Sequence, residues 1–178
     1  MRRIIFFIIG ILLLLLFFTA FTLFLPSKVT VAKSIRINAS SPEILSQTNN
    51  FNNWKTWYPV FRDSNVIVTI TGSNNRSAEL VDKYGRKMVF RILAVSNNEV
   101  DVELYVKEKS VTTYKIMLQS PGTTSTDVTW IAITNLGWYP WKKLQGLILD
   151  KATGEQYAYA LAGLKAVVES QADSVSPE

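Results

Sequence analysis

The chain has 178 residues, 19 Lys and Arg against 14 Asp and Glu, a net charge of +5, and neither histidine nor cysteine. The absence of both residue types excludes Ser-His-Asp and Cys-His catalysis, ordinary zinc and haem sites, disulfides and a lipid-modified cysteine anchor, and we expect no metal and no cofactor. The small cationic excess forms no basic stripe, so no nucleic-acid partner is expected either.

The first element is an uncharged apolar run over residues 4–25. As a helix it would be about 33 Å long, enough to cross a hydrocarbon core of about 30 Å. A cleaved signal sequence is the alternative, but its apolar region is usually shorter and ends in an A-x-A-like site, which this run lacks. The run therefore predicts an N-terminal transmembrane anchor comprising residues 1–27.

The charges that flank this run set its expected orientation. Arg2 and Arg3 precede it, whereas Lys28, Lys33 and Arg36 follow it closely. The paired arginines favour a cytoplasmic N-terminus, and the later cations weaken that bias. We therefore expect a single-pass protein of the inner (plasma) membrane, with the remaining chain on the periplasmic or extracytoplasmic side.

The remaining chain, about 150 residues, has the size of one ordinary domain. Alternating residues predict a first strand over 29–38. Ser41, followed by Pro42, predicts the start of a short helix over 42–48, and a second helical turn is expected over 51–55. Further strands are expected over 65–71, 76–82, 87–95, 99–107, 111–119 and 125–134. Their short, turn-rich connections indicate an antiparallel meander.

The last element changes to helical periodicity. Over residues 154–170, Tyr157, Leu161, Leu164 and Val168 recur at steps of four, three and four, and so form one apolar face. An antiparallel sheet with one apolar face needs a partner to cover it, so the sheet is predicted to wrap around this helix in an α+β fold. Residues 171–178 are small and polar, and we expect a flexible tail there.

Two motifs carry a resemblance to a known family. Trp54, Trp57 and Pro59 form a Trp-x-x-Trp-x-Pro segment after the first strand and short helix. The closing part reads GLILDK over 146–151 and ALAGLK over 160–165. In this combination and element order, the chain resembles membrane-anchored bacterial members of the polyketide cyclase/START-like (SRPBCC) superfamily.

The resemblance extends from Lys28 to Glu169 and implies a helix-grip fold for a domain of residues 28–170. It also implies a deep, mostly apolar cavity between the curved sheet and the last helix, since members of the superfamily bind lipids, sterols, polyketides or other hydrophobic molecules. The sequence departs from the family at 73–77 (SNNRS), where a Gly-rich turn is usual, and this affects the mouth of the pocket.

We therefore expect a membrane-tethered module that binds a hydrophobic or amphipathic small molecule. The bulky residues expected to line its cavity, chosen for the elements that carry them, are Trp57, Phe90, Trp130, Tyr157 and Leu161. Arg91 is a lone charge in the apolar strand 87–95. It either points outward or lies in the cavity and meets an acidic ligand head group, and we include it as a candidate ligand-binding residue.

Two other functions stay open. Some superfamily members catalyse cyclisation or dehydration, and here that would need a buried carboxylate or tyrosine with a strongly shifted pKa. A structural or interaction module would instead have a collapsed cavity and an exposed aromatic loop that docks a protein partner.

The candidate loop contains three aromatic residues followed by two cations. It could be a packed loop core, a rim of the pocket, or a segment inserted at the membrane interface, where Trp and Tyr beside Lys are the usual composition. The residues that we assign to a membrane interface are Trp138, Tyr139, Trp141, Lys142 and Lys143.

Overall fold

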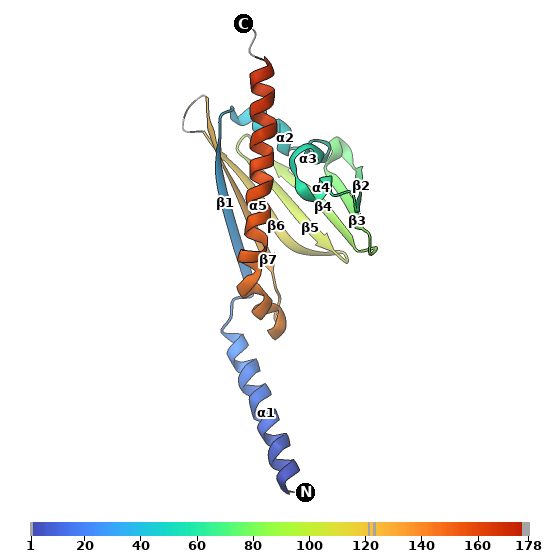
Figure 1. The fold of residues 1–178 in the computed structure, drawn as a ribbon, viewed down its shortest axis with the longest axis vertical. Helices are drawn as coiled ribbons and strands as arrows, with labels where there is room; N and C mark the ends of the chain where they lie inside the picture. Colours follow the sequence, from blue (N-terminus) through green and yellow to red (C-terminus); the bar gives the residue numbers. More distant parts are fainter. Residues whose placement is uncertain (1, 121, 123, 176–178) are drawn as a thin grey trace.

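The computed structural model describes residues 2–120, 122 and 124–175, and it consists of a projecting helix and an α+β body (Figure 1). The helices are α1 (Arg2–Leu23), α2 (Ser41–Thr48), α3 (Phe51–Trp57), α4 (Pro59–Arg62) and α5 (Pro140–Val175), with a 3-10 turn at Ser73–Asn75. The strands are β1 (Lys28–Ile37), β2 (Val66–Thr71), β3 (Ser77–Asp82), β4 (Lys87–Val95), β5 (Glu99–Val106), β6 (Lys109–Gln119) and β7 (Thr126–Asn135). The tail predicted to be flexible is helical as far as Val175, and residues 176–178 lie outside the described part.

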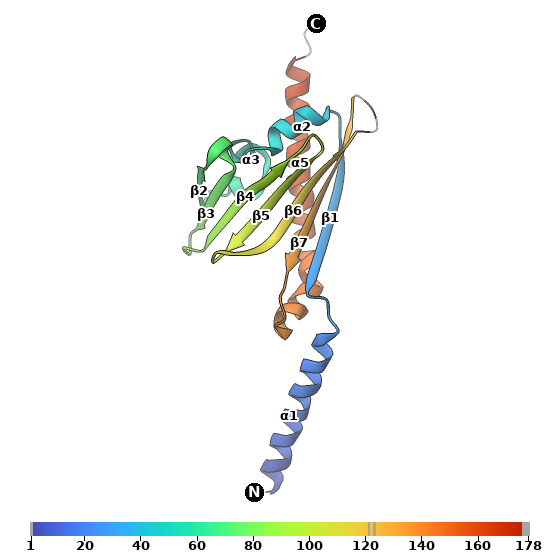
Figure 2. The same ribbon diagram turned by 180° about the vertical axis from the view of Figure 1, so that it is seen from behind.

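Helix α1 projects from one end of the body (Figures 1 and 2). Its side chains are exposed, except for Thr22 near its end. Within the described residues it is the one helix long and apolar enough to cross a membrane, and a signal sequence would show the same properties. Four residues, 24–27, connect it to β1.

The seven strands form one antiparallel sheet in the order β1-β7-β6-β5-β4-β3-β2. Strands β2 to β7 follow one another as the predicted meander, and β1 returns to lie beside β7. Because side chains alternate between the two faces, the register decides which residues are covered. Pairing of Ile116 with Trp130, for example, puts both buried side chains on one face. The sheet curves around α5, which covers this inner face (Figures 1 and 2).

The short helices lie beside α5 on the same face of the sheet (Figure 1). Helix α2 begins after Ser40, whose backbone N–H and hydroxyl both donate to Glu43 Oε2, at 2.7 and 2.8 Å. The capping residue is therefore Ser40, one position before the predicted Ser41. At the start of α3, the side-chain oxygen of Asn50 accepts a hydrogen bond from the N–H of Asn53 at 3.3 Å. These contacts satisfy backbone groups that a helix start leaves without an internal partner.

Glycine at one position allows α3 and α5 to approach closely. A Cβ atom at Gly163 would lie 2.5 Å from the backbone oxygen of Trp57. A Cβ atom does not come so near a carbonyl oxygen without displacing it, so only a residue without a side chain fits between the two helices. The position of α3 against α5, and with it the position of Trp57, depends on this contact.

The helix-grip α+β fold predicted from the sequence is confirmed. The main difference is that α5 begins at Pro140 and not at Gly154. Proline suits the first position of a helix, and the N–H of Lys142 already donates to the carbonyl of Tyr139 at 3.1 Å. The sequence offered Pro140 as a start signal for this helix, but the predicted helix was placed by the apolar face that begins at Tyr157.

Candidate functional site

Buried aromatic side chains fill the space between the sheet and the helices. Neighbouring rings have centroids 4.9 to 6.5 Å apart, a range in which offset and edge-to-face contacts are favourable. We call this group the interior aromatic cluster. It comprises Phe51, Trp54, Trp57, Tyr58 and Phe61 from α3 and the residues after it, Phe90, Tyr114 and Trp130 from β4, β6 and β7, and Tyr157 from α5.

The α3 side of the cluster is fixed by its tryptophans. Trp54 and Trp57 are three residues apart and so lie on one helix face. Their indole N–H groups donate to the backbone carbonyls of Thr48 and Gln47, at 3.0 and 3.1 Å. Both bonds hold the end of α2 against α3, and both indoles are satisfied by them.

Trp130 is at the centre of the cluster and differs from the other two tryptophans. Its Nε1–H is buried and has no hydrogen-bond partner. An unsatisfied buried donor costs about 1–3 kcal/mol, and the Nε1–H of Trp130 is such a group in this interior. The rings within 5.3 to 6.0 Å of the Trp130 ring are those of Trp54, Trp57, Tyr58, Tyr114 and Tyr157.

Three tyrosines of the cluster bring hydroxyl groups into this interior. Burial raises the pKa of Tyr58 far above its ordinary value, and the neighbouring Tyr157 raises it further. Burial also raises the pKa of Tyr114 and of Tyr157, whose rings meet edge to face with centroids 5.9 Å apart. All three hydroxyls therefore stay neutral near pH 7, where they can donate and accept hydrogen bonds but do not act as bases.

Carboxylates are not part of the interior. Among the side chains that the structure describes, no aspartate or glutamate is buried, and no group of three or more acidic residues is placed to hold a metal ion. On the outer face, Asp127 pairs with Arg36 at 2.7 Å, and that guanidinium holds the pKa of Asp127 below its ordinary value. The titratable side chains that line the described interior are therefore the three tyrosines, whose raised pKa keeps them protonated.

The five apolar residues predicted to line a cavity lie together, but in a packed interior, and none of them lines either of the two pockets described below. All five are buried on the face of the sheet that α5 covers, and four of them belong to the interior aromatic cluster. The fifth, Leu161, follows Tyr157 by one turn of α5. The residues are Trp57, Phe90, Trp130, Tyr157 and Leu161.

Arg91 does not lie in this interior. In β4 its neighbours Phe90 and Ile92 point inward and are buried, so the alternation of the strand turns Arg91 to the outer face. There its guanidinium carbon lies 4.8 Å from the centroid of the Tyr105 ring. An acidic head group inside the domain would not meet this arginine, so the outward-pointing alternative for Arg91 is the correct one.

Sequence reasoning missed three members of the cluster that touch Trp130. Tyr114 alternates with Ile116 and Leu118 along β6, a period-2 pattern that places all three on the covered face. That signal was available in the sequence. Trp54 and Tyr58 stand in an aromatic run in which every residue is a plausible core residue; Trp54 was noted as part of the Trp-x-x-Trp-x-Pro segment, but neither was included among the cavity residues.

A recess of about 430 Å³ lies next to the cluster. It is bounded by α4, the start of β2, the turn between β3 and β4, and α5. Val60, Val66 and Met88 line it and pack against the core, whereas its rim carries the ion pair of Arg86 with Asp82, at 2.6 Å. Two other lining residues, Pro59 and Gln156, adjoin Tyr58 and Tyr157 in the chain. The recess has the size of a small-molecule site, and its lining combines these apolar residues with polar and charged ones, among them Asp63, Asn65 and Lys83.

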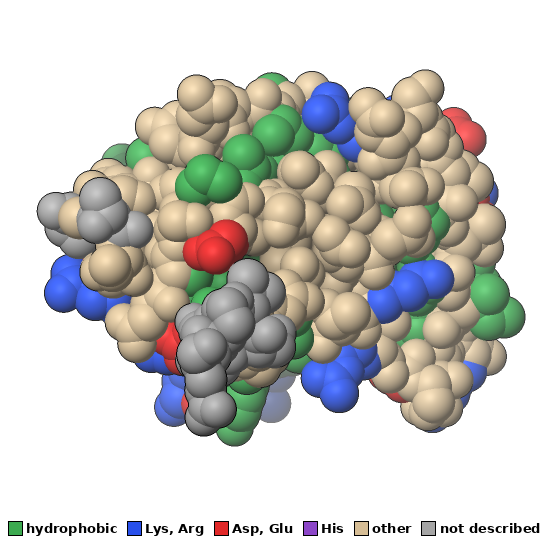
Figure 3. Space-filling model, turned by 90° about the horizontal axis from the view of Figure 1, so that it is seen from above, with side chains coloured by type: hydrophobic (Ala, Val, Ile, Leu, Met, Phe, Trp, Pro, Cys, Tyr) green, Lys and Arg blue, Asp and Glu red, His purple; other side chains and the backbone are tan. Residues whose placement is uncertain are grey.

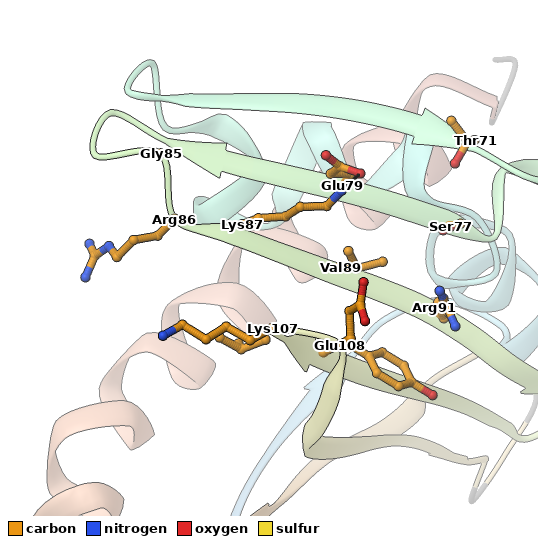
Figure 4. Close-up of a pocket in the computed structure, with 12 residues that line it drawn as sticks. Thr71, Ser77, Glu79, Gly85, Arg86, Lys87, Val89, Arg91, Lys107 and Glu108 are labelled. Atoms are coloured by element: carbon orange, nitrogen blue, oxygen red, sulfur yellow. Dashed lines mark ion pairs between the residues drawn. The ribbon is translucent and has the colours of Figure 1, made fainter.

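A larger groove, of about 1060 Å³, lies on the outer face over β3, β4 and β5 (Figure 4). Its lining mixes charges of both signs, with Lys87 and Glu79 paired at 2.7 Å across neighbouring strands. Arg86 and Lys107 extend away from the centre of the groove in Figure 4. This charged surface does not match the apolar cavity that the resemblance implies.

The residues assigned to a membrane interface separate into two groups. Trp138, Tyr139, Trp141 and Lys142 are exposed at the start of α5. Lys143 is buried, and its Nζ donates to the backbone carbonyl of Thr22 in α1, at 3.1 Å. The loop is therefore not a packed core, and Lys143 joins the body to α1 instead of extending into solvent.

A curved antiparallel sheet around a long C-terminal helix defines a START-like (SRPBCC) helix-grip protein. The chain belongs to the family described as polyketide cyclase / dehydrase and lipid transport, whose model matches residues 28–169. The superfamily predicted from the two terminal motifs is thus confirmed. None of the curated proteins compared with the chain matches it.

Solved structures share the fold at low sequence identity. A START superfamily protein from Mycobacterium smegmatis has a TM-score of 0.60 and 17% identity, covering 80% of this chain and 98% of that one. The Zhui aromatase/cyclase from Streptomyces sp. R1128 has a TM-score of 0.59 and 8% identity, with 80% and 94% covered. Norcoclaurine synthase from Thalictrum flavum, in complex with dopamine and hydroxybenzaldehyde, has a TM-score of 0.60 and 11% identity, with 85% and 90% covered. These similarities concern the fold, and function must be argued from the site.

Proposed function

We propose that the domain binds a hydrophobic or amphipathic, lipid-like small molecule and that α1 holds it at a membrane. The family description includes lipid transport as well as cyclase and dehydrase activity. The described interior contains aromatic rings and neutral hydroxyl groups and no buried carboxylate. This composition supports binding of an apolar ligand over acid–base catalysis.

The single observation that carries the proposal is the buried indole N–H of Trp130, which lacks an acceptor. An amphipathic ligand with a carbonyl or hydroxyl oxygen would supply one. Burying about 300 Å² of apolar ligand surface at about 25 cal/mol/Å² gives roughly 7 kcal/mol before association costs. The hydrogen bond to Trp130 would add about 1 kcal/mol and fix the polar end of the ligand.

We propose that the ligand enters the interior through the recess beside α4. Its apolar residues Val66 and Met88 would receive the ligand, and two cluster residues, Tyr58 and Tyr157, adjoin its lining residues Pro59 and Gln156 in the chain. Because aromatic rings already fill the interior, one or both of these tyrosine side chains would have to rotate to admit the ligand.

The test uses the full chain, including α1, purified in mild detergent and transferred to nanodiscs. Organic extraction and mass spectrometry identify any lipophile that co-purifies, and titration with cis-parinaric acid, read by energy transfer from tryptophan, measures affinity. Trp130→Phe removes the N–H but keeps a ring, and we expect it to weaken probe binding roughly fivefold. Tyr105→Phe, on the outer face, is the matched control and should bind as the wild-type chain does.

Absence of both a co-purifying lipophile and saturable probe binding, relative to empty nanodiscs, would overturn the proposal. That outcome would support a second candidate, an interaction module with a closed interior. The dense packing of the interior aromatic cluster favours this candidate, as do the exposed aromatic residues before α5.

A further inference from the structure

The first turns of α5 show an inverted distribution of polar and apolar side chains. Lys143 points inward and is buried, whereas Trp141, Leu147 and Ile148 are 58%, 62% and 66% exposed. On a helix that packs against a body in water, the lysine would face solvent and the large apolar residues would face the body. The outer side of these turns is therefore suited to an apolar environment.

The loop before α5 extends this apolar surface. At Gly137 the backbone turns with a φ of 71°, and the Gly137 N–H donates to Asn135 Oδ1 at 3.0 Å. The next residue, Trp138, is 72% exposed and stacks on Tyr139 at 4.5 Å between ring centroids; Tyr139 lies 5.0 Å from Trp141. The three rings pack on one another and not into the core. We call Trp138, Tyr139, Trp141, Leu147 and Ile148 the basal patch.

The basal patch lies beside the end of α1. The hydrogen bond from Lys143 to the carbonyl of Thr22 joins α5 to the last turn of α1, and the N–H of Leu136 donates to the carbonyl of Ser27 at 2.9 Å. Figures 1 and 2 both show the start of α5 next to this end of α1. The opposite end of the body, seen in Figure 3, exposes mostly backbone and polar atoms with scattered hydrophobic groups. Exposed aromatic side chains thus gather at the end from which the apolar helix leaves.

We propose that the basal patch is a second membrane contact, seated in the interfacial layer of the same phospholipid bilayer that α1 enters. This inference rests on the proposed anchoring by α1. Trp and Tyr place their rings among acyl chains and their polar ends among head groups. Lys142, whose Nζ lies 5.5 Å from the Tyr139 ring, would meet head-group phosphates from the same layer.

A second contact fixes the orientation of the body on the bilayer. With α1 alone, the body could rotate about the short connection at residues 24–27; with the basal patch seated as well, that rotation is restricted. The turn between β3 and β4, which flanks the recess, lies at the end of the sheet that faces α1 (Figure 1). Seating the patch would keep the mouth of the recess on the membrane-facing side.

The test is quenching of tryptophan fluorescence in vesicles of phosphatidylcholine and phosphatidylglycerol brominated at acyl carbons 6 and 7. The full chain has five tryptophans, of which Trp54, Trp57 and Trp130 are buried in the body. Bromolipid should quench part of the wild-type emission. In the double variant Trp138→Phe, Trp141→Phe, the quenched fraction should fall roughly twofold or more, since only the interior tryptophans remain.

A matched control places a tryptophan elsewhere on α5. In the double variant, Tyr159→Trp adds an indole at a position that is 71% exposed and outside the basal patch, and its emission should not be quenched. Equal quenching of wild type and double variant would overturn the proposal. So would unquenched wild-type emission accompanied by a dimer in nanodiscs, which would assign the patch to a second copy of the chain.

Alkaline carbonate extraction tests anchoring by α1 separately from membrane contact by the basal patch. Release of the chain from vesicles contradicts the anchoring, whereas a chain that is retained but unquenched contradicts only the contact by the patch.

Discussion

The protein has two groups of tryptophan and tyrosine residues, and they occupy opposite environments. In the interior aromatic cluster, Trp54, Trp57 and Trp130 are buried, and rings from α3, three strands and α5 contact one another. In the basal patch, Trp138 and Trp141 are mostly exposed, and their ring contacts are with Tyr139 alone. We therefore expect the same residue types to contribute to the stability of the body in the interior aromatic cluster and to contribute little to it in the basal patch.

This difference shows that burial and location give an aromatic residue its role. The interior rings join elements that are distant in the sequence, so each substitution there should be felt throughout the domain. The rings of the basal patch join neighbours within one loop, so their substitution should change what the surface binds and not whether the domain folds. Substitutions in each group can test this division, and we give them from the largest expected effect to the smallest.

Trp54→Ala should have the largest effect on stability. The substitution removes a fully buried ring that contacts six others, and it removes the hydrogen bond to the carbonyl of Thr48. We expect the free energy of unfolding to fall by about 3–5 kcal/mol. Denaturant unfolding of the full chain in mild detergent, followed by circular dichroism, measures it. A loss below about 1 kcal/mol would mean that the cluster is loosely packed.

Gly163→Ala should destabilise the protein even though alanine is the better helix former. Alanine in place of glycine usually stabilises a helix by about 1 kcal/mol. Here its Cβ would lie 2.5 Å from the Trp57 carbonyl oxygen and push α3 away from α5, at a cost of about 1–3 kcal/mol. The same unfolding experiment shows whether the free energy of unfolding falls or rises, and a rise would contradict the close approach of the two helices.

Alkaline pH should weaken the fold through the interior tyrosines. Burial raises the pKa of Tyr58, Tyr114 and Tyr157 in the folded state, so the folded chain keeps protons that the unfolded chain releases above about pH 10. The contribution of these tyrosines to the free energy of unfolding is therefore fully present below that pH, and it is lost as the pH rises beyond it. Absorbance at 295 nm should show these tyrosines ionising only together with unfolding, and ionisation of all seven tyrosines before any loss of circular dichroism would disprove this.

Trp141→Ala should have the smallest effect on stability. Its ring is exposed, and its ring contact is with Tyr139, so we expect a change within about 0.5 kcal/mol. Measured beside Trp54→Ala, this variant tests the division between the two groups directly. A loss comparable to that of the interior variant would show that the basal patch belongs to the core.

Much of the fold could be predicted because the strands alternate cleanly. In β5 the alternation of Val100 and Val102 with acidic residues indicated both the strand and its covered face, and Tyr157 and Leu161 showed the face of α5 that meets the sheet. Trp130, in contrast, was chosen as a bulky apolar residue on a strand expected to face the cavity, and alternation did not decide which face of that strand is covered. Alternation did not decide which face of β4 carries Arg91. Nearly all of the neighbours of Arg91 in this strand are apolar, so no polar face can be recognised in the sequence.

The start of α5 and the role of Lys143 were not predicted, for different reasons. The role of Lys143 depends on a contact between segments more than a hundred residues apart: its side chain reaches the Thr22 carbonyl at the end of α1. Trp141, Leu144 and Ile148 recur at helical spacing over the start of α5, but such a pattern does not show that the apolar face points away from the body. The missing acceptor for the Trp130 N–H is likewise a property of the packed interior alone.

The connection between α1 and β1 limits where the body can act. Its four residues could extend at most about 14 Å, and the hydrogen bond between Leu136 and Ser27 shortens it further. With α1 held in a bilayer, such a tether does not let the body cross to a second membrane and return. If the proposed anchoring and ligand binding hold, a ligand would arrive and leave at the surface of that one bilayer, by lateral diffusion or by a partner that comes to it.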